Sequence, residues 1–354
     1  MNNKGFISIS VVYSFFLVFL AIIVSIILIY SQRRILLNEV KKDIRENLQI
    51  SAKGYLNDVI LASYGGKDNL EVVTDFNSIN DGLYKAADES GMSYYFRGKI
   101  DNNYLKFGKD KNGKDMYWRI VRINGDESIK IIYEYSLDNS SSQNIKNGLE
   151  YNKYLDENGN YWIDFNKYDG SFIEKTLDTW YEDNLRNYSK YLSDYFFCND
   201  CEESSIKYPA GSNNLIYKSA ERLLIYDAKN PTFGCSQNVD KLSVSRKNLK
   251  YPIGIITADE VMFAGGLYNT SRDYYLVDGT VFWTMTGYDN SAKVGIGDAD
   301  LWYVESDGSL IHSDGLGRLF NSVRPVVNLA RHVRVKIGDG TIDAPYELSL
   351  DGEE

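Results

Sequence analysis

The sequence predicts an α+β fold in which a long N-terminal apolar helix is followed by a head of short strands and few helices. Three observations support this prediction. Phe6–Tyr30 is an almost unbroken apolar run. From residue 92 onward, brief runs of β-branched and aromatic residues alternate with Asn-Gly and Asp-Gly turns, which is typical of short antiparallel strands. Helical periodicity occurs in only a few segments of the head, and separate helices and strands of this kind indicate α+β architecture.

The run Phe6–Tyr30 predicts a transmembrane helix that places the chain in a lipid bilayer. Its 25 residues give about 37 Å of helix, and the hydrocarbon core of a bilayer is about 30 Å thick. A cleaved signal peptide would have a shorter apolar core and a small-residue cleavage site, whereas Arg33-Arg34 follows this run directly. A simple signal anchor that holds a domain at the cell surface fits the same hydropathy pattern, and this alternative stays open.

The helical pattern continues beyond the apolar run. Apolar residues recur every three or four positions from Leu37 to Val59, with charged residues on the other face. We therefore expect one helix over residues 6–62, a transmembrane segment and stalk, although a juxtamembrane spacer helix explains the same pattern. Residues 63–91 are rich in turn formers and predict a linker, with a short helical turn at Tyr84–Gly91. The head then occupies residues 92–350.

Composition indicates where the head acts. The net charge is −10 and the pI is about 4.9, and the sequence after residue 45 has no dense basic cluster, so nucleic acid is excluded as an expected partner. The 29 tyrosines, together with many Asn, Asp, Ser and Gly residues, are typical of an exported surface protein. Basic residues after the apolar run favour the opposite orientation, but large domains are translocated largely regardless of such charges. We expect a single-pass protein of the cell membrane with an extracellular C-terminal head.

The three cysteines predict one disulfide bond and no metal site. Cys198 and Cys201 have the Cys-x-x-Cys spacing of zinc sites, but a structural zinc needs four ligands, and only Cys235 and two distant histidines remain to supply them. In an oxidising compartment a disulfide is the expected state. We predict the pair Cys198–Cys235, which closes a longer loop than a pair with Cys201 would, and in which Cys201 takes no part.

Several elements of the head can be placed from the sequence. Asn124-Gly125 predicts the turn of a β-hairpin over Met116–Tyr133. An amphipathic helix is expected over Leu177–Leu192, with Thr176 as its N-cap. Thr257-Ala-Asp-Glu260 has the spacing of a capping box, which predicts a helix through Ala264. Four further strands are predicted at Tyr251–Thr257, Thr280–Thr284, Asp300–Val304 and Ser322–Leu329.

The junction Lys4-Gly5-Phe6 resembles the leader of type IV prepilins and pseudopilins. This resemblance implies cleavage between Gly5 and Phe6 by a prepilin peptidase, methylation of the new N-terminus, and assembly with other pilin-like subunits. Members of that family usually carry Glu at the position of Ser10. The departure implies a minor subunit, or a protein that joins no filament.

The head also resembles a known family. Tyr117–Gly125, Thr176–Trp180, Phe197–Asp200, Tyr251–Glu260, Phe282–Met285 and Val323–Leu329 are similar to motifs of uncharacterised extracellular domains from Gram-positive gut bacteria. This resemblance covers about residues 82–347 and implies no function. More distantly, Val323-Arg-Pro-Val-Val327 resembles the closing strand of formylglycine-generating enzymes, which implies a C-type-lectin-like fold. The copper-binding cysteines of those enzymes have no counterpart here, because no cysteine follows Cys235.

No catalytic residues or cofactor are predicted. His312 and His332 are in no recognisable nucleophile context and are interpreted as surface residues. Asp110–Asp115 and Gly297–Asp300 have partly calcium-like spacing, but neither completes a calcium loop, so both are interpreted as turns. Trp283, Trp302 and Tyr303 are the candidate ligand-binding residues, as an aromatic platform for sugars.

These observations together predict a non-catalytic, membrane-anchored surface protein. We expect a minor pilin or pseudopilin-like subunit with an adhesive head, whose extracellular ligand the sequence does not identify. Two alternatives stay open: an unprocessed single-span surface protein with a lectin-like domain, and a cell-surface hydrolase with paired carboxylates.

Overall fold

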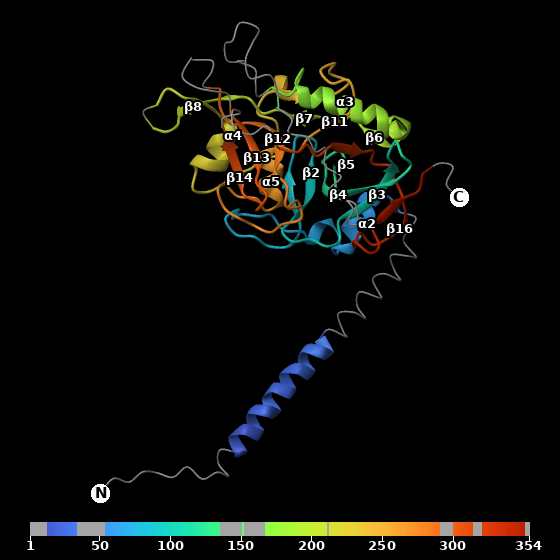
Figure 1. Cartoon of the computed structure of the whole chain (residues 1–354), viewed down its shortest axis with the longest axis vertical. Coiled ribbons are helices and arrows are strands. Elements are labelled where there is room, and N and C mark those ends of the chain that lie inside the picture. The colour runs from blue at the N-terminus through green and yellow to red at the C-terminus, as the bar shows by residue number, and fades with distance from the viewer. Residues whose placement is uncertain are drawn as a thin grey trace. The chain divides into compact units, whose positions relative to one another are not determined.

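The computed structural model describes residues 13–33, 54–134, 151, 167–210, 212–290, 300–313 and 321–350 (Figure 1). The chain divides into two compact units, residues 1–51 and residues 52–354. We describe each unit by itself and call the second unit the head.

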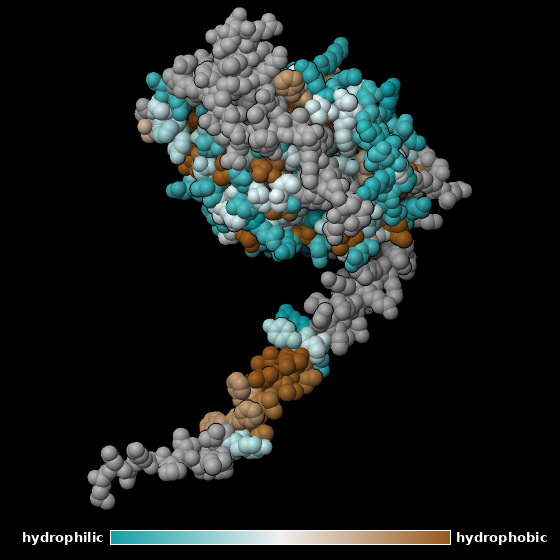
Figure 2. All heavy atoms as spheres, in the orientation of Figure 1, coloured by the Kyte–Doolittle hydropathy of each residue, from teal (hydrophilic) through white to brown (hydrophobic). Residues whose placement is uncertain are grey.

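The first unit contains a helix that is long and apolar enough to cross a membrane. It spans Tyr13–Arg33, 21 residues, and none of the apolar stretch is buried by other parts of the protein. Figure 2 shows apolar side chains gathered on this helix, while hydrophilic side chains predominate among the coloured residues on the visible face of the head. At about 1.5 Å per residue the helix is about 31 Å long, which matches the hydrocarbon thickness of a bilayer.

The prediction of one continuous helix over residues 6–62 is wrong at its C-terminal end. Helix α2 (Leu56–Ser63) starts separately, because the backbone of Tyr55 is extended and forms a bridge with Arg334. The Leu56 N–H also donates to the Val333 carbonyl, and the Val335 N–H donates to that of Gly54. Leu56 and Ile60 are fully buried, so α2 belongs to the core of the head rather than to a stalk.

The predicted linker over residues 63–91 is also wrong in part. Residues 82–87 form strand β1 (Gly82–Ala87), which pairs with β2 (Met92–Arg97). No helical turn forms at Tyr84–Gly91, because residues 84–87 belong to β1 and residues 88–91 form the tight turn to β2, closed by a bond from the Asp88 N–H to the Gly91 carbonyl. The head therefore includes this segment and does not begin at residue 92.

The core of the head is a ten-stranded sheet among the described residues. Its main path is β11-β15-β5-β4-β3-β17-β16, with β2 also paired to β4 and β6 to β15. The strands not yet defined are β3 (Tyr104–Lys109), β4 (Asp115–Ile123), β5 (Ile129–Tyr133), β6 (Leu192–Ser193), β11 (Ile253–Gly254), β15 (Val326–Leu329), β16 (Val335–Ile337) and β17 (Tyr346–Leu348).

The described residues also form three smaller sheets. β12 (Phe282–Gly287), β13 (Leu301–Val304) and β14 (Leu310–Ser313) form an antiparallel sheet. β7 (Phe197–Cys198) pairs with β10 (Lys241–Leu242), and β8 (Glu203–Lys207) pairs with β9 (Leu215–Tyr217). The remaining helical elements are α3 (Phe172–Asn184), α4 (Lys218–Ala220), α5 (Ala258–Ala264), a π turn over Glu221–Ile225, and 3₁₀ turns at Lys67–Asn69, Arg186–Tyr191 and Asn238–Asp240. The mixed α+β class predicted from the sequence is confirmed.

The predicted β-hairpin is present as β4 and β5, but its turn differs from the prediction. The strands end at Ile123 and resume at Ile129, so Asn124–Ser128 form a five-residue loop. The Asn124 N–H donates to the Ser128 carbonyl, and Glu127, not Gly125, has a positive φ of 71°. The Asn-Gly pair therefore predicted the position at which the chain reverses direction, but the connection is a five-residue loop and not a two-residue turn.

A β-bulge at Val121 decides which side chains share a face of the sheet. Arg119 pairs with Ile132, and Arg122 pairs with Lys130, so Val121 has no partner in this ladder. Directly paired residues share a face, and alternate residues of β5 do so as well. Arg119, Arg122 and Lys130 therefore point to the same side, although strict alternation would separate the two arginines.

The two faces of the central strands are covered by different helices. We call one the aromatic face: Trp118 and Tyr133 pair directly, and both rings contact Trp180 of α3 at centroid distances of 6.1 and 5.0 Å. We call the other the ionic face. It carries Arg122 and Lys130, which meet Glu260 of α5. In Figure 1, α3 is green and α5 is orange.

Both helices start at side-chain caps, but only one cap was predicted. Helix α5 has the full capping box: Thr257 Oγ1 accepts from the Glu260 N–H, and Glu260 accepts from the Thr257 N–H. Helix α3 begins at Ser171, whose Oγ accepts from the Glu174 N–H at 3.0 Å. The predicted N-cap Thr176 lies inside α3, where its hydroxyl donates to the Phe172 carbonyl. The predicted span Leu177–Leu192 was thus too late at both ends.

The remaining predicted strands are present with shifted bounds. Tyr251–Thr257 contains β11, and Thr280–Thr284 overlaps β12. Asp300–Val304 corresponds to β13, while only the second half of Ser322–Leu329 forms β15.

Candidate functional site

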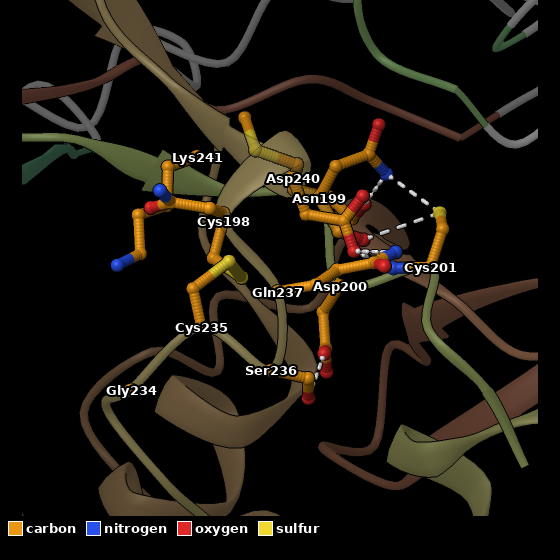
Figure 3. The surroundings of a disulfide bond; sticks show 12 residues. Cys198, Asn199, Asp200, Cys201, Gly234, Cys235, Ser236, Gln237, Asp240 and Lys241 are labelled. Carbon is orange, nitrogen blue, oxygen red and sulfur yellow. Dashed lines mark hydrogen bonds between the residues drawn. A yellow bond between two sulfur atoms is a disulfide. The ribbon is translucent and has the colours of Figure 1, made fainter.

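The predicted disulfide bond is confirmed. Cys198, at the end of β7, is bonded to Cys235 in the loop of residues 230–237, which we call the disulfide loop (Figure 3). Cys201 lies outside the bond. Its sulfur is directed toward Asn199, whose side-chain N–H donates to it at 3.3 Å. Among the described residues, no group of three or more His, Cys, Asp or Glu side chains could hold a metal ion.

Beside this bond, the ionic face carries a buried cluster centred on Glu260. The Glu260 carboxylate lies 2.6 Å from the Lys130 ammonium and 3.2 Å from Nε of Arg122, and these side chains are at most 3% exposed. Arg122 also lies 3.3 Å from the carboxylate of Asp88. Asp88 in turn accepts from Ser93, Tyr195 and the Gly125 N–H, so the cluster fixes the hairpin loop to β2. Each ion in this group has a partner, as burial of charge requires.

The protonation of this pair follows from its surroundings. Burial would raise the pKa of Glu260, but the positive charges of Lys130 and Arg122 outweigh burial and lower it to about 2. For Lys130, burial is the largest effect and lowers the pKa to about 8, although the Glu260 charge opposes the shift. Glu260 is therefore ionised at every physiological pH.

A second ionic centre joins this cluster to the disulfide loop. Nε and Nη2 of Arg222, in the π turn, each lie 2.7 Å from an oxygen of Asp259, and Arg222 also pairs with Asp200. The loop contributes two bonds: the Thr232 N–H donates to Asp259, and the Ser236 hydroxyl donates to Asp200. Asp259 and Glu260 are adjacent in α5, so one turn of helix supports both centres.

A small cavity lies between the two centres. It measures about 20 Å³ and is lined by Arg122, Lys130, Phe196, Cys198, Asp200, Arg222, Thr232, Phe233, Gly234, Thr257, Asp259 and Glu260. A volume of this size holds about one water molecule. Phe233 of the disulfide loop closes it: the ring is 5% exposed, stacks on Phe263 at 3.9 Å, and lies 4.3 Å from the Arg122 guanidinium. In this closed form the cavity admits no organic substrate.

A larger hollow lies at the surface beside β3. This groove has a volume of about 140 Å³ and is lined by Lys106, Gly108, Lys109, Asp115, Tyr188, Glu347, Leu348 and Leu350. Its charges alternate: Lys106 lies 2.6 Å from Glu347, and Lys109 lies 2.6 Å from Asp115. Tyr188 forms a wall, and its hydroxyl oxygen accepts from the Lys109 N–H. The groove has both signs of charge and an apolar side.

The predicted aromatic platform is wrong. Trp283, Trp302 and Tyr303 are at most 1% exposed, so none of them presents a face to a ligand. Trp283 pairs with Tyr303 across β12 and β13, and both rings pack inward. The aromatic side chains of these strands serve the core because the sheet is covered on both sides.

Other predicted residues have mixed outcomes. His332 is exposed, as expected for a surface residue. His312 is largely covered: its ring stacks on Tyr288 at 3.6 Å and its Nδ1 lies 3.4 Å from Asp300. Asp110 forms a turn with the N–H groups of Asn112 and Lys114, as interpreted. Gly5 and Phe6 lie outside the described residues, as do residues 297–299 of the second calcium-like pattern.

Sequence reasoning missed the ionic cluster. Thr257–Glu260 was interpreted only as a capping box, although its two acidic residues also bind two buried cations, Arg122 and Lys130, and the largely covered Arg222. The available signal was a charged residue, Lys130, within the otherwise apolar strand Ile129–Tyr133. Comparison of the chain with models of protein families, with curated proteins and with solved structures gave no match.

Proposed function

We propose that this chain is a membrane-anchored surface protein with a non-catalytic, ligand-binding head, carried by a helix of the minor pilin or pseudopilin type. One combination carries the proposal: a helix able to span a bilayer, Tyr13–Arg33, precedes a head that contains a disulfide bond. Disulfides persist in oxidising compartments outside the cytoplasm, so the bond supports an exported head.

The orientation can be tested on intact cells. Added protease is expected to degrade the head while cytoplasmic proteins stay intact, and non-reducing electrophoresis should show two of the three cysteines unreactive toward a thiol reagent. A head that is protected from protease, with three reactive thiols, would contradict the proposal.

The pilin-type anchor rests on the resemblance of Lys4-Gly5-Phe6 to prepilin leaders. Sequencing of the N-terminus of the membrane-extracted protein should give methylated Phe6. A Gly5→Val variant should retain the leader, because the resemblance implies cleavage directly after this Gly, whereas the matched Ser10→Ala variant should be processed normally. An intact Met1 in the wild-type protein would support the unprocessed single-span alternative instead.

The ligand-binding part of the proposal rests on the groove beside β3. Its two ammonium and two carboxylate groups suit a small zwitterionic ligand, such as an amino acid or the end of a peptide, and the partly exposed Leu350 offers apolar contact. The ion pairs Lys106–Glu347 and Lys109–Asp115 lie at the surface, where such a pair contributes about 0–1 kcal/mol to stability. A ligand can therefore displace them at low cost in free energy. The C-type-lectin-like origin suggested by Val323–Val327 supports a binding head in the same way.

Binding can be measured with the full chain in detergent micelles, using a panel of amino acids, short peptides and glycans. We expect binding of a zwitterionic probe that falls at least tenfold in Lys106→Ala. Lys99→Ala is the matched control, because Lys99 forms a surface ion pair with Asp273 outside the groove. Glycan binding that is insensitive to Lys106→Ala would show that the ligand site lies elsewhere on the head. Turnover of any probe would favour the hydrolase alternative.

A further inference from the structure

We infer that the disulfide loop is a redox-controlled lid: the Cys198–Cys235 bond holds it closed over the ionic cavity, and reduction of that bond by a dithiol opens the cavity while the rest of the head stays folded. Three features of the structure lead to this inference: the position of the bond, the contacts of the loop, and the charges that it covers.

The bond lies at the edge of the cavity. Cys198 lines the cavity from β7, and Thr232, Phe233 and Gly234 line it from the disulfide loop. The two cysteines are 37 residues apart in sequence, so the bond ties the disulfide loop to β7, a distant segment of the chain. Of the contacts that hold residues 230–237 in the described part of the head, this one alone is covalent.

The other contacts of the loop can exchange with water. The Cys235 N–H donates to Glu89 at 2.7 Å, the Thr232 N–H donates to Asp259, and the Ser236 hydroxyl donates to Asp200. At the ends of the loop, the Asn230 N–H donates to the Arg222 carbonyl and the Gln237 side chain donates to Asp240. Pro231 and Phe233 supply the apolar contacts, and the Phe233 ring packs on Tyr95 and Phe263 and covers Arg122. A short segment without regular secondary structure, held by noncovalent contacts of this kind, can open locally before the core does.

Opening would expose groups that are otherwise sealed. Lys130 is 2% exposed, and the carboxylates of Asp259 and Glu260 are 4% and 3% exposed. Three cations and the carboxylates that pair with them would then face water in a polar pocket. Hydration of these charges favours the open form, because a buried ion gives up its hydration on closure.

The chemistry of the switch is ordinary thiol–disulfide exchange. Cys235 is the more exposed partner, since Cys198 is buried. A thiolate of the dithiol attacks Sγ of Cys235, the S–S bond breaks, and Cys198 leaves as a thiolate that takes up a proton. The second thiol of the reductant then attacks the mixed disulfide, releases the Cys235 thiolate and leaves as a cyclic disulfide. Two electrons pass from the dithiol to the protein.

The amine of Lys130 reports the state of the lid. The full chain in detergent micelles is treated with an acetylating reagent, with and without dithiothreitol, and the acetylation of each lysine is followed by peptide mass spectrometry. We expect Lys130 to react at least tenfold faster after reduction, while the exposed Lys67 reacts at the same rate in both forms. Amide hydrogen exchange in β12 and β13 should not change.

Variants separate the lid from other effects of reduction. Cys201→Ser should behave as the wild type, because Cys201 is outside the bond. The double variant Cys198→Ser, Cys235→Ser should show fast acetylation of Lys130 without reductant. Phe233→Ala should give the same result with the disulfide intact, which tests the closure by Phe233 independently of the cysteines.

Two results would overturn the inference. The first is a Lys130 that stays protected although mass spectrometry shows the bond to be reduced. The second is a rise in amide exchange of β12 and β13 that parallels the acetylation of Lys130, because the bond would then hold the whole head and not a lid.

Discussion

The aromatic face and the ionic face lie on opposite sides of strands β4 and β5, and both are buried. They are stabilised by different interactions. On the aromatic face, Trp118 and Tyr133 pack against Trp180 and need shape complementarity. On the ionic face, Arg122 and Lys130 need opposite charges at hydrogen-bond distance, which Glu260 supplies. A poorly filled apolar site costs dispersion and transfer energy, whereas an unpaired buried ion costs its full desolvation.

The stability of the head should therefore respond differently to the loss of one side chain on each face. Contacts on the aromatic face are shared among many atoms, so truncation is graded by size. On the ionic face one carboxylate, that of Glu260, serves two cations and a helix cap, while Asp88 pairs with Arg122 alone of these two cations. The following predictions test this difference, beginning with the largest expected effect.

Glu260→Ala is expected to lower the free energy of unfolding by about 3–5 kcal/mol. The substitution leaves the ammonium of Lys130 buried without its carboxylate and also removes half of the capping box of α5. Chemical denaturation of the full chain in detergent measures the loss. Glu71→Ala, at an exposed position, is the control and should change stability by no more than about 0.5 kcal/mol. A loss below about 1 kcal/mol for Glu260→Ala would show that the cluster does not depend on this carboxylate.

Ile131→Ala, on the aromatic face, is expected to cost about 2–4 kcal/mol, and Ile131→Val about 0.5–1.5 kcal/mol. Ile131 is fully buried beside Ile120, so each methyl group that is removed leaves unfilled volume. Denaturation curves of the two variants give the gradation with size. Equal losses for both would indicate that packing at this position is not what stabilises the aromatic face.

Lys130→Met is expected to cost less than about 1.5 kcal/mol at pH 7, because Glu260 keeps Arg122 and the Thr257 N–H as partners. The pKa of Lys130 is lowered from 10.5 in the unfolded chain to about 8 in the folded protein. Between these values the unfolded state binds more protons, so this lysine makes stability rise with pH from about 8 to 10.5. The difference between the wild-type and Lys130→Met stability curves should show this rise. A flat difference would contradict the burial of a charged lysine.

Ser171→Ala is expected to have the smallest effect, about 1 kcal/mol, because only the cap of the helix on the aromatic face is lost. Thr176→Ala is the matched control: its hydroxyl bonds within α3 and caps nothing, so its effect should be smaller. Thermal unfolding of both variants checks the order. A larger loss of stability for Thr176→Ala than for Ser171→Ala would indicate that Thr176, and not Ser171, caps the helix.

Local signals in the sequence were sufficient where one segment decides its own structure. The capping box at Thr257 and the reversal near Asn124 depend on residues within a few positions of each other, and both were found. The start of α3 was missed because Ser171 and Thr176 are both acceptable caps, and burial of Ile173 decides between them. The candidate site was missed because its charges come from β4, β5, α5 and the π turn, which no local pattern connects.

The sequence by itself determined that an apolar helix precedes an α+β head, because length and hydropathy act along the chain, and its three cysteines indicated one disulfide bond whose partners, Cys198 and Cys235, are brought together by the fold. Only the tertiary structure decided that Tyr55 forms a bridge with Arg334, that Trp283 and Trp302 are core residues, and that the bulge at Val121 brings Arg122 to the side of Lys130 and Glu260. The physical reason is that burial and the pairing of charges depend on which distant segments meet, and a single extra residue in a strand changes the face to which a side chain points.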